Sequence, residues 1–355
     1  LGRDYVAGPV SRFDIPFMWP ILSKFKEFQW SQKTLSGEKE AGLVQARGVG
    51  GNGILSSMVY MRALPSDIEA WGLPSWGWER MLGLYKDLEH YAGHNDQAGV
   101  HGSCSSSGDD SPSYSQRHCS DRVTTAPSQH VDEVSSAFVE AASTAGFEQC
   151  ADFNNHHERR RGVGWLDFNI AGGVRDSSAR RFLSPILRDP GLVLEAEASV
   201  TQVLMNADVS LNATYPAHST DPPAYRAIGV EFRQNGELKR AFLKNAMIPE
   251  KLQAQFDATS RGVILTAGAL QSPQLLIKSG IGPLDELTAA GIEPKVISEG
   301  VGRGLQDHPT VAVLAVLDDQ LATSLASGYD LLSSLPGYVG AVEQAQQSRG
   351  HESSR

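Results

Sequence analysis

The sequence has little cysteine, no long apolar run and no excess of positive charge. Only three of its 355 residues are cysteines, and no two of them have the C-x-x-C spacing of a zinc or redox site. No apolar run approaches the roughly 18 to 20 residues that a membrane-spanning helix needs. The formal net charge of −10 argues against nucleic acid or an anionic membrane surface as the main partner. These absences exclude a disulfide framework, a membrane span and a nucleic-acid-binding surface as the basis of function.

The remaining composition is that of an ordinary globular chain. Its length suits two domains or one large one, with 41% hydrophobic and 20% charged residues. Cys104 and Cys119 share a polar segment and can pair under oxidising conditions, although free thiols are favoured for them and for Cys150. The sequon at Asn212 matters only in a secreted protein. No signal peptide is visible and the chain begins at Leu1, so the sequence assigns no compartment.

The hydrophobic pattern predicts two long helices. One follows Trp76, and its expected buried stripe is Met81, Leu84, Tyr85 and Leu88. The other spans residues 131–145, and its expected apolar face is Val131, Val134, Phe138 and Ala141. Between them, residues 93–129 are rich in Ser, Asp, Gly and His, which predicts a long loop.

Strands and loops are predicted elsewhere. The first 40 residues have no clear period and predict packed irregular chain. Strands are expected at 193–205, 227–232 and 311–317, and loops at 206–225 and 244–259. The end of the chain, 318–355, is rich in Ser, Gln and Gly and has little core-forming power.

The stretch 262–283 predicts a buried strand that runs into a helix. Val263 to Thr266 is apolar and rich in β-branched residues, and Gly268 breaks it. Ser272 suits an N-cap, Pro273 suits the first turn, and Gly280 ends the helix. Such a junction presents backbone N–H groups to an anion, although many α/β proteins have one without a ligand.

Three short patterns do not predict a binding or catalytic site when each is taken alone. The run 48–53, GVGGNG, matches G-x-G-x-x-G, but the strand before it is poor and the acids Asp67 and Glu69 follow too soon for a dinucleotide fingerprint. The adjacent histidines in 156–161, HHERRR, cannot share a face, which favours a charged loop over a zinc site. Asp307 and His308, directly before a proline, favour a turn over a catalytic pair.

Four longer motifs, however, occur in order along the chain. They are RGVGGNGILSSMVYMRA at 47–63, GVRDSSARRFLSP at 173–185, GALQSPQLLIKSGIGP at 268–283 and GVGRGLQDHP at 300–309. Together they resemble the glucose–methanol–choline (GMC) oxidoreductase family of FAD enzymes, over roughly residues 10–315. Any one motif alone would not be specific.

The resemblance implies an α/β (α+β) fold. Residues 1–310 would form a FAD/NAD(P)-binding-type nucleotide domain, incomplete at its N-terminus, with loop insertions near 93–129 and 206–225. Residues 311–355 would begin a sheet-based substrate domain. The family's own G-x-G-x-x-G would precede Leu1 and its catalytic histidine would follow Arg355. We therefore expect the middle part of a longer protein, with no catalytic residue in this chain.

The resemblance also reassigns the glycine run to a loop that lies along the flavin and the pyrophosphate. Small residues suit such a loop because side chains would hold the backbone away from the cofactor. Val200 would meet the adenine end through its backbone. The implied FAD-binding residues are Val49, Gly50, Gly51, Asn52, Ser56, Ser57, Met58, Val59, Val200, Gly268, Asp307 and His308. Asn52-Gly53 departs from the family's usual Ser-Ser, and Ser56 from its usual Asn.

The function implied is oxidation of a CH–OH donor, with hydride passing to FAD and a small-molecule alcohol as substrate. A FAD-retaining lyase or decarboxylase and a non-catalytic remnant remain as alternatives. Because the pyrophosphate turn and the base would lie outside the chain, we expect weak FAD retention and no turnover by this chain alone. No metal site is expected.

Overall fold

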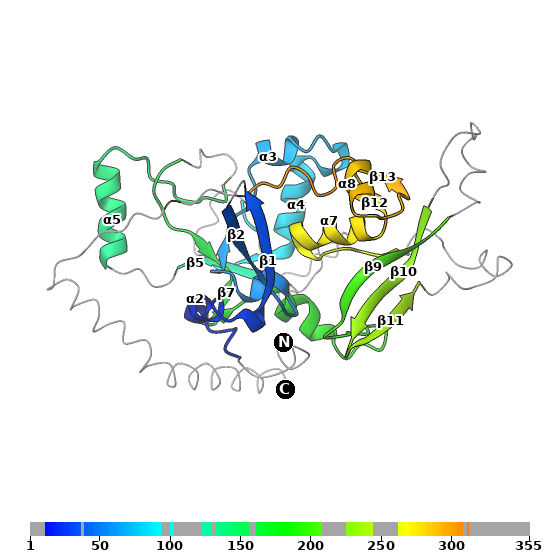
Figure 1. Ribbon diagram of the computed structural model, residues 1–355. Helices are drawn as coiled ribbons and strands as arrows, with labels where there is room; N and C mark the ends of the chain where they lie inside the picture. The colour runs from blue at the N-terminus through cyan, green and yellow to red at the C-terminus, as the bar shows by residue number, and fades with distance from the viewer. Residues whose placement is uncertain are drawn as a thin grey trace, which may run out of the picture. The chain divides into compact units, whose positions relative to one another are not determined.

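The computed structural model describes residues 11–36, 39–93, 100–102, 122–128, 133–155, 161–207, 225–243, 262–307 and 311. The chain divides into two compact units, the first ending at Leu194 and the second running from Glu195 to Leu317 (Figure 1). Both units mix helices and strands, in agreement with the α/β class expected. None of the helices in the described ranges is long and apolar enough to cross a membrane.

The first unit begins with short helices and a β-hairpin. The helices are η1 (Pro16–Met18), α2 (Trp19–Leu22) and η2 (Lys26–Phe28), and the strands are β1 (Gln29–Ser36) and β2 (Lys39–Ala46). The two strands pair antiparallel, from Gln29 opposite Ala46 to Ser36 opposite Lys39. The prediction of irregular chain here was therefore wrong for 29–36. That strand, QWSQKTLS, is mostly polar, so it shows no apolar alternation to detect.

The core of this region joins residues from distant parts of the chain. Phe13, Leu22 and Phe28 pack with Ala46 and with the buried side chains that follow the glycine run, Ile54 and Leu55. The rings of Phe13 and Phe28 meet edge to face with centroids 5.0 Å apart. The hairpin leads directly into the glycine run, and the run continues into η3 (Gly51–Ile54). Because Ala46 and Ile54 both pack in this core, the glycine run between them is anchored at its two ends.

A four-stranded sheet forms the centre of the first unit. Its order is β3 (Val59–Tyr60), β6 (Asp167–Phe168), β5 (Val123–Pro127) and β4 (Glu89–Tyr91), with only the β4–β5 pair parallel. The internal strand β5 corrects the expected loop over 93–129. Its sequence VTTAP is rich in β-branched residues, but the polar chain around it hides that signal. Val100 and His101, from the same expected loop, are buried as well.

Helix α4 (Trp78–Leu88) confirms the helix expected after Trp76, but its buried stripe is different. Trp78 and Leu82 are buried with Ile68 of α3 (Pro65–Glu69), and Met81 and Tyr85 are partly buried beside them. Leu84 and Leu88 are 38% and 44% exposed. The buried stripe begins at Trp78, the first residue of the helix, and continues at Leu82. The buried face of the helix is therefore turned about the helix axis relative to the face that was expected. The turn η4 (Pro74–Trp76) precedes this helix.

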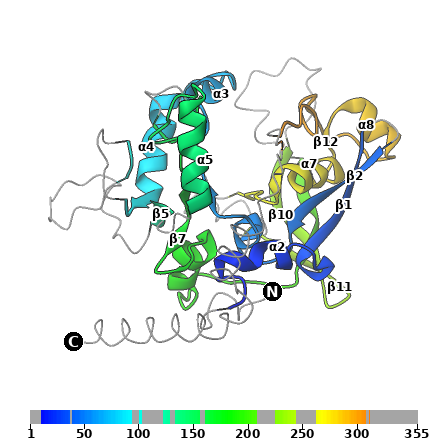
Figure 2. The same cartoon turned by 90° about the vertical axis from the view of Figure 1, so that its left-hand side faces the viewer.

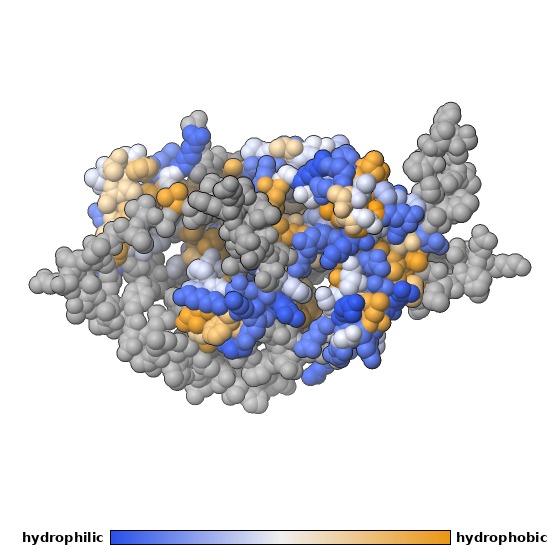
Figure 3. Space-filling view, in the orientation of Figure 1, coloured by the Kyte–Doolittle hydropathy of each residue, from blue (hydrophilic) through white to orange (hydrophobic). Residues whose placement is uncertain are grey.

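Helix α5 (Glu133–Thr144) confirms the second predicted helix, but not its buried face. None of its described residues is buried, and Phe138 is 67% exposed. The helix stands away from the sheet of its unit (Figure 1), and apolar residues over it lie at the surface (Figure 3). The spacing of apolar residues predicts that a helix is amphipathic. It does not predict whether another element packs against the apolar face and buries it.

The first unit ends with a small hairpin and two helical turns. The hairpin pairs β7 (Ile170–Ala171) with β8 (Val174–Arg175), and the turns are η6 (Ala179–Leu183) and η7 (Ser184–Ile186). These elements carry the motif at 173–185 and return the chain to the glycine run, because Ala179 belongs to the same core as Ile54.

The second unit contains a three-stranded antiparallel sheet and two helices. The sheet order is β11 (Glu237–Phe242), β10 (Tyr225–Gln234) and β9 (Ser199–Ala207), so the strands predicted near 193–205 and 227–232 exist with shifted bounds. Helix α7 (Gly268–Lys278) lies beside this sheet (Figure 2), and Ser279 Oγ accepts a 2.8 Å hydrogen bond from Val203 N. Beyond it come β12 (Ile281–Gly282), parallel to β13 (Val296–Ile297), and α8 (Leu284–Ala289).

The junction at 262–283 corrects two expectations. Residues 263–266 pair with no strand in the described part of the chain, and Ile264 is 88% exposed, so this is not a buried strand. The helix begins at Gly268 rather than at the proline, and Ser272 Oγ accepts a hydrogen bond from Ala267 N from inside the first turns. Gly280 ends the helix as predicted, with a φ of +88°.

Some expectations fall outside the described residues. They include the strand at 312–317, the tail 318–355, most of the loops at 206–225 and 244–259, the sequon Asn212, the pair Cys104 and Cys119, the double histidine at 156–157, and His308. Cys150 is described and is a buried thiol.

Candidate functional site

The glycine run folds into a tight turn that depends on Gly50. Gly50 has a φ of +99° and Gly51 a φ of +56°, both in the left-handed region. A Cβ on Gly50 would lie 2.9 Å from Ile54 Cγ2 and 3.0 Å from Ala179 Cβ. Any other residue at position 50 would therefore be strained and would also collide with the core.

The next residues expose bare backbone. A Cβ on Gly51 or Gly53 would meet no atom within 4 Å, and both residues are exposed. Asn52 between them is exposed as well, and its Oδ1 accepts a 2.8 Å hydrogen bond from Ala46 N. The loop thus presents a short strip of backbone, Gly51 to Gly53, with open space where the side chains of its two glycines would lie. Such a strip fits a flat cofactor that must approach the main chain closely.

Arg175 holds the far end of this loop. Its Nη1 donates to Gly53 O at 3.1 Å and to Ser56 Oγ at 3.2 Å, and its Nε donates to Phe13 O at 2.9 Å. Arg175 is 1% exposed, so these bonds satisfy a buried cation. Met58 follows with a φ of +64°, a buried side chain and a carbonyl that accepts from Asn169 N.

The expected FAD-binding residues are spread over both units. In the first, Val49 packs against the core, Ser56 is exposed, Ser57 is half-buried and Val59 is 37% exposed. In the second, Val200 pairs with Phe232 in the sheet, Gly268 opens α7 with a φ of +87°, and Asp307 is exposed. The residues from Gly50 to Val59 are consecutive in the sequence and form one continuous segment of the first unit. Their convergence with the second set around one groove stays a prediction.

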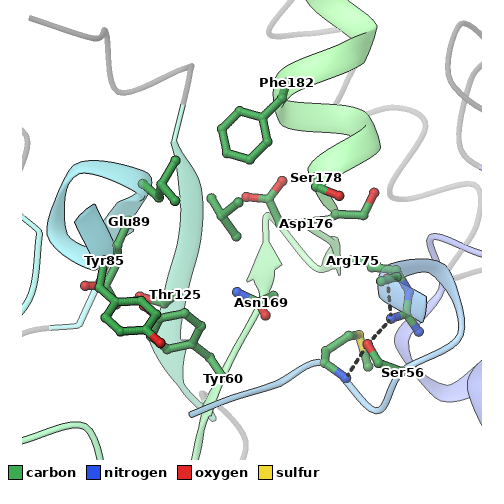
Figure 4. A pocket seen from close by; sticks show the side chains of 15 residues that line it. Ser56, Tyr60, Tyr85, Glu89, Thr125, Asn169, Arg175, Asp176, Ser178 and Phe182 are labelled. Atoms are coloured by element: carbon green, nitrogen blue, oxygen red, sulfur yellow. Dashed lines mark hydrogen bonds between the residues drawn. The ribbon is translucent and has the colours of Figure 1, made fainter. Parts of the chain in front are cut away.

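A cavity of about 340 Å³ lies in the first unit, next to this segment (Figure 4). Ser56 and Met58 line one side, and strands of the central sheet contribute Tyr60 and Thr125. Helix α4 contributes Tyr85, while Phe182 of η6 points in from another side. Asp176 and Asn169 complete the wall between them. The cavity is therefore lined both by the segment that follows the glycine run and by the sheet.

Glu89 is the buried carboxylate of the cavity wall. It follows directly on the last residue of α4, and four groups hold its oxygens. Arg62 Nη2 and Gly102 N donate to Oε2, while Thr125 Oγ1 (2.6 Å) and His101 Nδ1 (3.0 Å) contact Oε1. The side chains of Arg62 and Glu89 are 0% and 1% exposed, so this is a fully buried ion pair.

His101 lies between two carboxylates. Its Nδ1 contacts Glu89, its Nε2 lies 3.1 Å from Asp152 Oδ2, and its ring stacks on Tyr91 with centroids 3.7 Å apart. Asn154, near Asp152 in sequence, accepts from Arg62 N and donates to Asp167 Oδ2 at 2.9 Å. We call Arg62, Glu89, His101, Asp152 and Asp167 the buried polar cluster.

The surroundings of this cluster shift its pKa values in opposite directions. Burial opposes the charge on His101, but its bonds to Asp152 and Glu89 outweigh burial and raise its pKa to about 9. Burial likewise opposes the charge on Glu89, yet the hydrogen bond from His101 and the charge of Arg62 lower its pKa. Burial raises the pKa of Asp167. Burial and the nearby charge of Glu89 raise the pKa of Tyr60 to about 12.

These groups could also be considered as a metal site. Ligand atoms of His101, Asp152 and Asp167 lie within 4.8 Å of one another. However, each nitrogen of His101 faces a carboxylate oxygen, and both nitrogens can donate only in the imidazolium form. A metal needs a neutral ring with a lone pair directed at it. The geometry therefore favours a proton at this position.

A comparison with protein families identifies the chain. The GMC oxidoreductase family model matches residues 31–310. The chain belongs to the GMC oxidoreductase family. The glycine run, the hairpin at 170–175 and the helix α7 all lie inside the matched range, so the resemblance inferred from four motifs is confirmed.

Two curated relatives of this GMC chain are named as dehydrogenases. An alcohol dehydrogenase [acceptor] of Pseudomonas putida is 28% identical over 323 residues, which cover 89% of this chain and 49% of that protein. A mitochondrial choline dehydrogenase of Homo sapiens is 32% identical over 263 residues, which cover 73% of this chain and 35% of that protein. The chain thus spans about half or less of the relatives that it matches.

A solved structure shares the fold. Pyridoxine 4-oxidase from Mesorbium loti matches 81% of this GMC chain and 48% of its own chain, with a TM-score of 0.60 and 23% sequence identity. At that identity the likeness supports the arrangement of elements and not the substrate.

The buried polar cluster was missed by reasoning from the sequence. Its members lie between positions 62 and 167, and no local spacing links them. His101 falls in a stretch whose polar composition predicted a loop. The one usable signal was Glu89 directly after the amphipathic helix, because a carboxylate that follows an apolar helix into a strand requires a buried partner.

Proposed function

We propose that this chain carries part of the FAD site of an oxidoreductase that acts on CH–OH donors. The observation that carries the proposal is the open space beside the backbone at Gly51 and Gly53, inside the range matched by the family. When bound, FAD supplies the acceptor for the hydride of an alcohol carbon. The nucleotide-domain assignment of residues 1–310 and the start of a substrate domain at 311–355 belong to the same proposal.

The residues of this chain would position the cofactor and would not transfer protons. Asn52 anchors the middle of the strip by accepting a hydrogen bond from Ala46 N, and Arg175 anchors its end by donating to Gly53 O. This leaves the strip itself open for the cofactor, with Val49, Ser56, Ser57 and Val59 at its borders. The remaining residues that we expect to contact FAD are Val200, Gly268, Asp307 and His308.

We further propose that the chain alone does not oxidise alcohols. A general base must reach the hydroxyl proton. The pKa of the cluster histidine, His101, is raised to about 9, and in the imidazolium form both of its nitrogens donate, to Glu89 and to Asp152, so it is a poor proton acceptor at neutral pH. It therefore acts as a structural cation and not as the base.

A titration of residues 1–355 with FAD, followed by flavin fluorescence, tests the cofactor proposal. We expect weak binding, with a Kd on the order of 10 µM or weaker. Gly53→Leu would place a side chain in the open space over the strip and should weaken binding at least ~10-fold. Gly83→Leu is the matched control, because Gly83 also has no atom within 4 Å of its Cβ position and lies on the exposed side of α4.

Both variants should keep the wild-type unfolding midpoint. If FAD binds the wild-type chain and Gly53→Leu with equal affinity, the strip is not the cofactor surface. If no binding is detected at millimolar FAD, the chain does not hold the cofactor by itself and the proposal fails.

A further inference from the structure

The turn η6 (Ala179–Leu183) has the geometry of a π-helix. In a π-helix, hydrogen bonds join residues five positions apart, and Ser184 N donates to Ala179 O in this manner. Such turns are rare and occur frequently at functional sites. The side-chain contacts of η6 show which part of the first unit it supports.

Ala179 supports the backbone directly before the strip Gly51–Gly53. It is buried and packs in the same core as Ile54. A Cβ on Gly50 would lie 3.0 Å from the Ala179 methyl carbon, so the two residues already pack closely. A shift of Ala179 would therefore move Gly50, and with it the start of the strip.

The next two residues bind η6 to two different parts of the first unit. Arg181 Nε lies 2.6 and 2.7 Å from the two carboxylate oxygens of Asp176, and Arg181 Nη2 donates to Thr124 Oγ1 at 3.1 Å. Arg180 Nη1 lies 2.8 Å from Asp14 Oδ2. The turn is thus joined to strand β5 through Arg181 and to the segment before η1 through Arg180.

Asp14 is fully buried, with an exposed fraction of 0%. Ser11 N (2.7 Å) and Ser11 Oγ (3.0 Å) donate to Oδ2, the oxygen that also contacts Arg180. The other oxygen, Oδ1, is buried without a hydrogen-bond partner among the described residues. A buried carboxylate is costly unless a cation compensates its charge. Arg180 supplies that cation, so the position of η6 is tied to that of Asp14.

The backbone of Asp14 also reaches the other end of the strip. Asp14 O accepts a 2.8 Å hydrogen bond from Arg175 N, and the carbonyl of Phe13 accepts from Arg175 Nε at 2.9 Å. Arg175 Nη1 in turn donates to Gly53 O at 3.1 Å, beside its contact to Ser56 (Figure 4). Asp14 is therefore connected to one end of the strip through Arg175 and to the other end through η6.

We propose that Asp14 and Arg180 are positioning residues for the strip Gly51–Gly53. Their ion pair holds η6 so that Ala179 keeps Gly50 in place, and Asp14 is too deeply buried to contact a ligand over the strip itself. Treating the strip as a surface for FAD rests on the proposed function. The effect of the ion pair on the strip does not.

Hydrogen–deuterium exchange of residues 1–355, read by mass spectrometry, tests the proposal without FAD. Asp14→Asn keeps the shape of the side chain but removes the charge that pairs with Arg180. The amides of Gly51, Leu55 and Ser56 donate hydrogen bonds within the segment, so a peptide covering residues 48–56 reports on its order. We expect this peptide to exchange at least ~5-fold faster in Asp14→Asn, and a peptide covering β4 to be unchanged.

Asp189→Asn is the matched control. It makes the same change of charge, but Asp189 is exposed and accepts its 2.7 Å hydrogen bond from Gly191 N. Equal exchange of the 48–56 peptide in the two variants would overturn the proposal. So would faster exchange of the β4 peptide to the same degree, because Asp14 would then stabilise the whole unit and not the strip.

A titration with FAD separates positioning from simple attraction between charges. Removing a negative charge should by itself favour the anionic diphosphate of FAD. If the ion pair positions the strip, Asp14→Asn should instead weaken FAD binding about 5- to 10-fold, because the surface is no longer held ready for the cofactor. Tighter binding by Asp14→Asn than by Asp189→Asn would contradict the proposal.

Variants of Arg180 complete the test. Arg180→Met should reproduce the faster exchange of the 48–56 peptide, and Arg180→Lys should restore most of the protection, since it keeps a cation beside Asp14. Arg180→Met with wild-type exchange would refute the role of the ion pair. If the exchange results are as expected but the wild-type chain binds no FAD, the positioning of the strip stands and the proposed function fails.

Discussion

Each unit gathers acidic residues around one arginine, but the two groups meet very different surroundings. In the first unit Arg62 contacts Glu89 with both side chains almost fully buried. In the second unit Arg303 reaches Asp285 at 2.8 Å, Glu299 at 3.2 Å and Glu286 at 3.4 Å, with all four side chains at least 42% exposed. The exposed group has three ion pairs around a single guanidinium.

The number of ion pairs around an arginine is therefore a poor guide to how much they stabilise the fold. Water already solvates the exposed group, so forming its pairs gains little free energy. The buried cluster has lost that solvation, and every partner left unmatched would cost the full desolvation free energy. The buried cluster also forms part of the cavity wall through Glu89, whereas Arg303, Asp285 and Glu299 of the exposed group line an open hollow at the surface of the second unit.

The largest effect is expected from removing the buried arginine. Arg62→Met should lower the free energy of unfolding by about 3 to 5 kcal/mol, because Glu89 loses its main cation inside the protein. Urea unfolding of residues 1–355 measures this. The double variant Arg62→Met/Glu89→Gln should recover part of the loss, since it also removes the uncompensated charge. A double variant less stable than the single one would contradict this account.

The pH dependence of stability should reveal His101. Its pKa rises from an ordinary 6.5 to about 9 on folding. A raised pKa means that its contribution is fully present below pH 6.5 and is lost as the pH rises through 9. The shift corresponds to about 3 kcal/mol. Urea midpoints between pH 6.5 and 9.5 test this, in a range below the titration of Tyr60. His101→Gln is the control, and an unchanged pH slope in that variant would exclude His101 as the cause.

Asp152 should matter less, because its side chain is 23% exposed. Asp152→Asn keeps the shape but removes one of the two carboxylates that hold His101, and we expect a loss of about 1 kcal/mol. The more specific readout is the pKa of His101, followed by NMR, which should fall because the imidazolium loses a partner. An unchanged pKa would show that Glu89 alone sets it.

The sequence predicted the parts of this molecule that depend on local pattern. The helices at 78–88 and 133–144, the end of α7 at Gly280 and the family itself all follow from spacing or motif. Burial was predicted less well. Leu84, Leu88 and Phe138 are exposed because a helix's apolar face becomes core only where a neighbour covers it.

The candidate site divides in the same way. The glycine strip was expected from its motif, and its positive φ angles at Gly50 and Gly51 agree with that reading. The cavity wall was not expected, because it combines Tyr60, Glu89, Thr125 and Phe182 from segments as much as 122 positions apart in the sequence. Such contacts are set by strand pairing, above all by β5, whose short polar-looking sequence concealed an internal strand.

The smallest effect is expected from the exposed group. Arg303→Met removes three ion pairs at once, yet the urea midpoint should not change measurably, because all the partners remain solvated by water. Any small difference seen at low ionic strength should disappear at about 0.5 M salt, where the screening length is only a few ångströms. Arg62→Met, measured under the same conditions, should keep its full loss, since salt does not reach a buried pair. If Arg303→Met proved as damaging as Arg62→Met, exposure would not be what separates the two groups.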